Sequence, residues 1–156
     1  MIELFHILFD NLINHSLNQP NQLNCMTIFE SKANINKPVN EVYQFLADMN
    51  NHQQLMPDNI LDWVSTTDEA RFNIQNMAKL TLKIDSRIEN AEIKIIPFEK
   101  PPFDLELKWL LADAGTHTEV VFTIAADLNM MMKMLASGPL QKLADHETQR
   151  LTEVFI

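Results

Sequence analysis

Apolar and polar residues alternate in several short runs between residues 27 and 124, and no other feature of the chain constrains its fold as strongly. Successive side chains of a β-strand point to opposite faces of the sheet, so alternation is typical of a strand with one buried face. The seven runs that we interpret as strands span residues 27–35, 60–65, 70–75, 79–88, 92–95, 105–111 and 120–124. Ala114 and Gly115 mark a turn between the last two runs, which predicts an antiparallel hairpin.

Two short helices are predicted between the first and second strands. Pro38 suits the first turn of a helix because its missing amide hydrogen needs no partner there. The apolar face of this helix consists of Val42, Phe45, Leu46 and Met49. A second short helix is predicted around residues 51–56, and Pro57 ends it.

The last predicted element is a long helix that opens at Asp127 or Asn129, either of which can cap it, and runs to about Phe155. Pro139 lacks an amide hydrogen and clashes with the preceding turn, so we expect a kink or a restart there. The side predicted to face the sheet consists of Met131, Met134, Leu135, Leu143, Leu151 and Val154. These elements predict an α+β domain in which a curved, seven-stranded antiparallel sheet wraps around the long helix.

Residues 1–17 form a separate pattern, an apolar helical stripe that stops before a polar linker at 18–24. The stripe consists of Ile2, Phe5, Leu8, Phe9, Leu12 and Ile13. We expect a domain over 26–156 preceded by an N-terminal extension over 1–25. Two interpretations of the extension stay open: an upstream stretch included through an early start codon, or a helix that docks on the domain, on a second copy or on another protein.

The composition fits a single domain, because a chain of 156 residues that is 46% hydrophobic can bury a core of ordinary size. The net charge of -9 repels phosphate backbones and argues against a nucleic-acid partner. No apolar run reaches the roughly 20 residues that a bilayer-spanning helix needs, and no basic start of a signal peptide is present. Cys25, the single cysteine, has no disulfide partner within the chain, so we expect a reducing compartment, the cytoplasm.

Two segments resemble a known superfamily. The segment NINKPVNEVYQFLAD over 34–48 is similar to the turn from first strand to first helix in the START-like SRPBCC superfamily, and DLNMMMKM over 127–134 is similar to the entry of its last helix. This superfamily has the helix-grip fold and includes birch-pollen-type allergens and polyketide cyclase/dehydrase-like proteins. The likeness is strongest to small bacterial SRPBCC proteins of undefined role. It implies a hydrophobic cavity under the final helix, and no shared catalytic residues.

Motifs for cofactors and metals are missing from the sequence. With Gly115 and Gly138 as its only glycines, the chain has no glycine-rich loop for a nucleotide phosphate, and we expect no cofactor. His146 and Glu147 are followed by Arg150 where a zinc-binding helix would need a second histidine. The histidines are scattered and are interpreted as exposed loop residues: His6, His15, His52, His117 and His146. We therefore expect no metal.

No catalytic residue can be assigned, and the candidates for acid–base chemistry are limited to His146 and Glu147. Both lie one turn from Leu143 and Leu151, so one of them can reach toward the interior. A carboxyl or imidazole group in an apolar pocket has a shifted pKa and can act as an acid or a base. The alternative is a solvated stripe in which both side chains face water beside Arg150.

Methionine and tryptophan each allow two interpretations. The methionines at 130, 131, 132 and 134 either make a deformable pocket wall or simply fill the core, because methionine adapts to irregular apolar surfaces. Trp63 and Trp109 either pack in the core or form flat cavity walls whose ring nitrogens orient a ligand.

The inward positions are mostly apolar, which is typical of a small-molecule pocket. We predict a protein that binds a lipid-like or polycyclic molecule between sheet and last helix, rather than an enzyme. The predicted ligand-binding residues are Phe72, Ile74, Leu82, Ile84, Ile95, Leu107, Trp109, Phe122, Ile124, Met131, Met134, Leu135 and Leu143. The alternatives are a cyclase- or dehydratase-type enzyme that uses the same cavity, and a protein-interaction module of the chaperone-cofactor kind that uses residues 1–17.

Overall fold

The computed structural model describes residues 26–76, 78–99 and 103–156. The predictions for residues 1–25 therefore lie outside the described part of the chain. The elements, in order, are β1 (Met26–Ile35), α2 (Val39–Leu46), α3 (Met49–His52), the 3-10 helix η1 (Gln53–Leu55), β2 (Ile60–Ser65), β3 (Glu69–Ile74), β4 (Ala78–Ile88), β5 (Glu92–Pro97), β6 (Leu105–Asp113), β7 (Thr118–Asp127) and α4 (Met130–Val154). The α+β prediction, with two short helices after the first strand and a long helix at the end, is confirmed.

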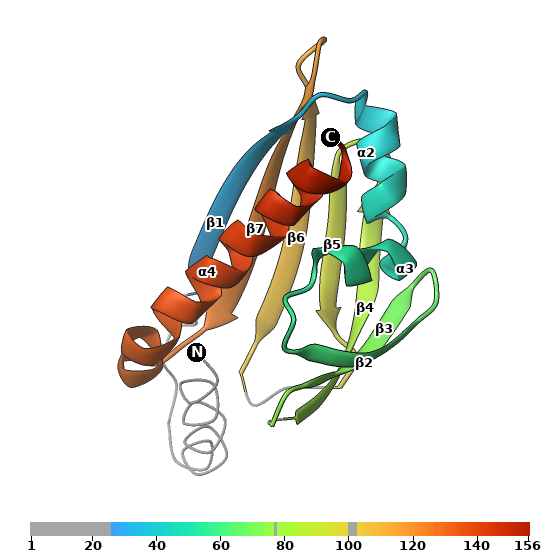
Figure 1. The fold of residues 1–156 in the computed structure, drawn as a ribbon. Helices are drawn as coiled ribbons and strands as arrows, with labels where there is room; N and C mark the ends of the chain where they lie inside the picture. The colour runs from blue at the N-terminus through green and yellow to red at the C-terminus, as the bar shows by residue number, and fades with distance from the viewer. Residues whose placement is uncertain (1–25, 77, 100–102) are drawn as a thin grey trace.

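The strands form one antiparallel sheet in the order β1-β7-β6-β5-β4-β3-β2. The first and last strands of the chain are neighbours, with Met26 opposite Asp127 and Ile35 opposite Thr118. Figure 1 shows α4 lying diagonally across one face of the curved sheet, with its C-terminal end beside α2. The core fills the layer between this face and the helices, and buried side chains alternate along β7 as the sequence predicts.

Two irregularities change which side chains reach that layer. Between Leu61 and Val64 of β2 the register shifts by one residue, and Asp62 adopts a left-handed conformation with φ 54°. Between Ile84 and Ser86 the register of β4 against β5 shifts in the same way. An extra residue in one strand reverses the alternation that follows it.

The shift in β4 corrects one expectation. Unbroken alternation along 79–88 predicts that Ile88 shares the buried face of Leu82, but Ile88 is 56% exposed. Arg87 instead turns toward the helices, where its Nε and Nη2 donate to the Ala47 carbonyl at 3.0 and 2.8 Å. Nη2 also donates to the Thr67 carbonyl at 3.1 Å and lies 2.7 Å from an Asp68 carboxylate oxygen. Arg87 therefore ties the end of α2 to the β2–β3 connection.

The long helix α4 begins where the sequence predicts, because the Asn129 side chain accepts a hydrogen bond from the Met132 amide at 2.9 Å. Of the kink or restart expected at Pro139, the restart is wrong, since one helix continues through this residue. Ser137 donates to the carbonyl of Lys133 one turn earlier, as serines inside helices often do. At the other end, the rings of Phe45 and Phe155 meet edge to face at 5.3 Å and join α2 to α4.

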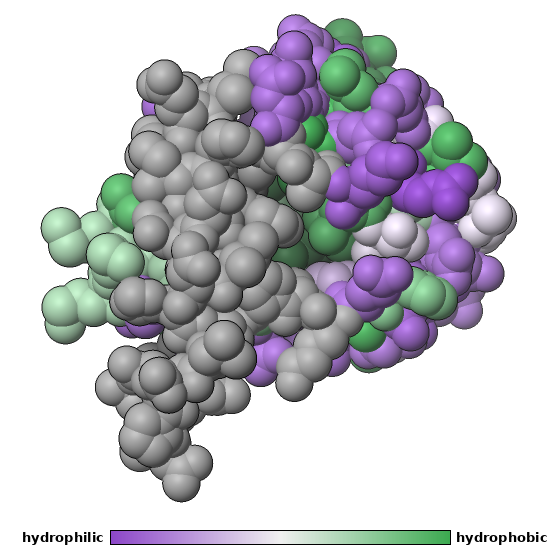
Figure 2. Space-filling model, turned by 90° about the horizontal axis from the view of Figure 1, so that it is seen from below, coloured by the Kyte–Doolittle hydropathy of each residue, from purple (hydrophilic) through white to green (hydrophobic). Residues whose placement is uncertain are grey.

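The predicted orientation of the first turns of α4 is also wrong. Met131 and Met134 are 45% and 81% exposed, whereas Met132 and Ala136 are buried. Each helical residue is rotated by about 100° from the one before, so positions 132 and 136 share a face that positions 131 and 134 do not. Figure 2 shows pale green apolar side chains projecting from this end of the molecule.

Candidate functional site

The layer between the sheet and α4 contains most of the residues predicted to bind a ligand. Those that are buried in it are Phe72, Leu82, Ile95, Trp109, Phe122 and Ile124. Those that are partly buried and pack against the core are Ile74, Ile84, Leu107, Leu135 and Leu143. Met131 and Met134 do not join them, as described above. The structure thus brings together apolar side chains from five strands and one helix.

Trp109 of β6 occupies the middle of this layer and is fully buried. Its ring stacks on Phe122 of β7 with centroids 4.2 Å apart and meets the His52 ring edge to face at 6.5 Å. Its Nε1–H is buried and has no hydrogen-bond partner among the described residues. Buried N–H groups are nearly always paired, so an unpaired indole nitrogen is a position where a bound molecule can contribute the missing acceptor.

Trp63 reaches the same layer because of the irregularity in β2. Its ring lies parallel to that of Phe72 on β3, with centroids 5.2 Å apart and an interplanar angle of 8°. Nε1 of Trp63 is also buried without a partner in the described residues. Both tryptophans therefore pack on a core ring, and each keeps a buried donor without a partner in the described residues.

Glu147 is buried, which is one of the two placements that the sequence left open for it. It is 4% exposed, so the interpretation in which it faces water is wrong. Within the described residues, no hydrogen bond or ion pair offsets its burial, and loss of hydration raises the pKa of its carboxyl to about 8. Its carboxyl is therefore largely protonated and neutral near neutral pH.

The neighbouring contacts of α4 show which way Glu147 points. The Thr148 hydroxyl hydrogen bonds with the Ser31 hydroxyl of β1 at 2.8 Å, and Arg150 Nε donates to the Gln54 carbonyl of η1 at 3.3 Å. Around the helix, Glu147 lies between these two sides, because successive residues are about 100° apart. Its side chain is thus directed toward the layer between β1 and η1.

The histidines differ from one another. The expectation of an exposed loop residue is wrong for His52, which is buried, with Nε2 2.8 Å from the carbonyl oxygen of Leu46. Burial lowers the pKa of His52, so its ring stays neutral. His146 is partly buried and its Nε2 lacks a partner in the described part of the chain. His6 and His15 lie outside the described residues.

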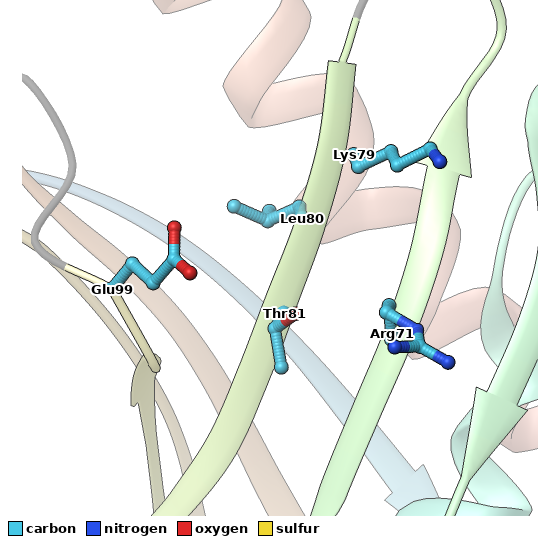
Figure 3. A pocket seen from close by; sticks show the side chains of 5 residues that line it. All are labelled: Arg71, Lys79, Leu80, Thr81 and Glu99. Atoms are coloured by element: carbon cyan, nitrogen blue, oxygen red, sulfur yellow. The ribbon is translucent and has the colours of Figure 1, made fainter.

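A separate depression of about 280 Å³ is lined by Arg71, Lys79, Leu80, Thr81 and Glu99. Figure 3 shows that these side chains do not converge, because Arg71 and Lys79 lie on one side of β4 while Leu80 and Glu99 lie on the other. Its lining is mainly polar and differs from the apolar layer under α4. We assign it no role.

Metal-binding and membrane features can be stated only for the described residues. Over 26–76, 78–99 and 103–156, no three His, Cys, Asp or Glu side chains gather as a metal site would require. Among the helices of these same ranges, none is both long and apolar enough to cross a bilayer.

The chain is similar to known proteins in structure, but no similar sequence was found. No family model and no curated protein matches the chain. A START superfamily protein from Mycobacterium smegmatis is 14% identical, with a TM-score of 0.60 over 81% of this chain and 98% of that chain. A norcoclaurine synthase point mutant from Thalictrum, in complex with a transition-state analogue, is 8% identical, with a TM-score of 0.63 over 86% and 99%.

A third similar structure is the Aha1 dimer from Colwellia psychrerythraea, which is 15% identical, with a TM-score of 0.64 over 83% of this chain and 96% of that chain. Each of these proteins is matched over nearly its whole length. At such low identity the likeness establishes the fold. The helix-grip fold that the resemblance implies is thereby confirmed.

Proposed function

We propose that the chain binds an apolar small molecule, lipid-like or polycyclic, in the layer between the sheet and α4. The observation that carries this proposal is the pair of buried indole nitrogens, Trp63 Nε1 and Trp109 Nε1, which have no hydrogen-bond partner in the described residues. The buried carboxyl of Glu147 adds a third polar group to the layer. A buried polar group without a partner costs roughly 1 to 3 kcal/mol. A ligand that supplies the partners offsets this cost, which gives the chain a reason to retain these groups.

The surroundings of these groups support the same proposal. Ligand pockets are typically apolar, with a few polar groups that fix orientation. Leu143 lies one turn before Glu147 on α4 and is partly buried against the core, so it belongs to the wall that a ligand would touch. The structural neighbours include a norcoclaurine synthase solved with a bound transition-state analogue, which is consistent with a ligand-holding fold.

The test screens apolar compounds by thermal shift and tryptophan fluorescence against the wild type and two variants, each with one leucine replaced by tryptophan. Leu143→Trp fills the layer, whereas Leu110→Trp adds the same ring to the exposed face of β6. We expect fatty acids, sterols or flat polycyclic compounds to raise the melting temperature of the wild type and of Leu110→Trp. The affinity of Leu143→Trp for these compounds should be at least about tenfold lower than that of the wild type. Equal binding by both variants would place the ligand elsewhere.

Glu147 also favours a second candidate, an enzyme that uses the same layer. A carboxyl group with a pKa of about 8 holds a proton that it can give to, or take from, a bound substrate near neutral pH. This candidate predicts turnover of a bound compound that Glu147→Gln abolishes without loss of binding. If none of the compounds that bind is turned over, the enzyme is excluded and the binding function is retained.

A further inference from the structure

Trp109 lies in a transverse row of the sheet, and the turn of α4 that carries Glu147 covers the β1 end of this row. Ser31 of β1 is opposite Phe122 of β7, and Phe122 is opposite Trp109 of β6. Neighbouring strands are about 4.8 Å apart, so Trp109 lies roughly 10 Å from Ser31 across the sheet. The hydroxyl of Thr148 is bonded to Ser31, which places this turn of α4 at the β1 end of the row.

Glu147 points along this row rather than away from it. It precedes Thr148 by one residue and is rotated from it toward the side of α4 that contacts η1. That side covers the layer in which Trp109 stacks on Phe122. The buried carboxyl of Glu147 therefore enters the layer from the helix. The indole nitrogen of Trp109, which has no partner in the described residues, enters it from the sheet.

We propose that the ligand presents a carbonyl oxygen, as in a polycyclic or long-chain ketone, to hydrogen-bond donors on Glu147 and Trp109. This inference rests on the proposed function and specifies its ligand. An indole N–H can only donate. Glu147 also donates when protonated, as its burial favours. A carbonyl oxygen has two lone pairs and no hydrogen, so it satisfies both donors at once.

Other ligand groups fit this pair of donors less well. A primary amine would ion-pair with an ionised Glu147, but it would bring hydrogens toward the Trp109 N–H. A hydrocarbon would leave both polar groups unpaired, with the cost that burial imposes. An amine and a hydrocarbon are therefore the ligands against which the binding of a ketone should be compared.

The experiment uses three probes of nearly equal shape: acetylnaphthalene with a ketone, isopropylnaphthalene with a hydrocarbon group, and naphthylethylamine with an amine. Their dissociation constants are measured by calorimetry for the full chain and for Glu147→Gln, Glu147→Leu and Trp109→Phe. We expect the wild type to bind the ketone roughly tenfold more tightly than the hydrocarbon, as one or two net hydrogen bonds would give. Glu147→Gln should keep the preference because its amide N–H still donates.

The two variants that remove a donor distinguish a polar contact from a purely structural role. Glu147→Leu and Trp109→Phe should each lose most of the ketone preference while still binding the hydrocarbon, which shows that they fold. Equal binding of ketone and hydrocarbon to the wild type, or tightest binding of the amine, would overturn the inference and leave the proposed function standing. If no probe binds the wild type, both are overturned.

Discussion

The hydroxyl of Thr148 on α4 lies 2.8 Å from the hydroxyl of Ser31 on β1, which joins two residues 117 positions apart. This hydrogen bond links the long helix to the edge strand. It also sets the rotation of α4, because Glu147 next to it is turned toward the interior while Asp145 stays exposed. The position of the candidate site thus depends on a contact between two small hydroxyl side chains.

Removing this contact should lower the stability of the domain. Thr148→Val keeps the shape of the side chain but leaves the Ser31 hydroxyl without its partner, so we expect a loss of about 1 kcal/mol in the free energy of unfolding. A double-mutant cycle with Ser31→Ala should give a coupling energy of about 0.5 to 1.5 kcal/mol. The control is Thr152→Val on the same helix, an exposed residue whose hydroxyl donates only to the Thr148 carbonyl. A coupling energy near zero would show that the helix is held elsewhere.

Glu147 should make the stability of the domain depend on pH. Burial raises its pKa from 4.5 to about 8, so the folded chain holds this proton more tightly than the unfolded chain. The resulting stabilisation is complete below pH 4.5 and is lost as the pH rises to about 8. The free energy of unfolding of the wild type, relative to Glu147→Leu, should fall by about 1.4 kcal/mol per pH unit within this window.

Chemical denaturation at several pH values measures this difference, and Glu147→Gln is the matched control. The glutamine has nearly the same volume and no proton to lose, so its pH profile should follow that of Glu147→Leu. The charged and titratable groups on this part of α4 are Asp145, His146, Arg150 and Glu153, and both variants keep them. If the wild-type profile runs parallel to both variants, Glu147 does not titrate in this window.

Arg87 should matter more than an ordinary exposed arginine, because it donates to two backbone carbonyls besides pairing with Asp68. Arg87→Met keeps the length of the side chain but leaves the Ala47 and Thr67 carbonyls without these donors. We expect a loss of about 1 to 2 kcal/mol in the free energy of unfolding. Arg71→Met, an exposed arginine on β3, is the control and should change it by less than about 0.5 kcal/mol. Equal losses would contradict the bridging role of Arg87.

The domain over 26–156 should fold without residues 1–25. The polar linker at 18–24 separates the two parts, and β1 begins at Met26 already paired with β7. Thermal melts of the full chain and of the truncated chain should show cooperative transitions at similar temperatures. A truncated chain that unfolds without cooperativity would show that the extension completes the core.

The alternating pattern was sufficient to predict the strands and most inward positions, but not the places where the pattern reverses. At both irregularities the alternation is interrupted, by an apolar pair on each side of Asp62 and by the polar run from Asp85 to Arg87. Such an interruption does not show which face the residues that follow it take. Its consequence, the inward turn of Arg87 and the exposure of Ile88, appears only when the pairing with β5 is known.

The errors on α4 have a different origin. Methionines at 130, 131, 132 and 134 are apolar on every side of the helix, so periodicity cannot select the face that packs. For Glu147 the sequence left both an inward and a solvated placement open, because an acidic residue is expected in water unless it is paired. Its inward placement is shown by its 4% exposure, by the hydrogen bond between Thr148 and Ser31, and by the contact of Arg150 with η1.

The central claim, that the layer under α4 holds an apolar ligand, is tested most directly by native mass spectrometry of the freshly purified full chain. The account predicts an added mass of small-molecule size that disappears on denaturation, or that forms on incubation with an apolar ketone, and that is reduced in Leu143→Trp but not in Leu110→Trp. A bare protein mass under both conditions would contradict the account and identify the layer as closed core, which would favour a protein-interaction module instead.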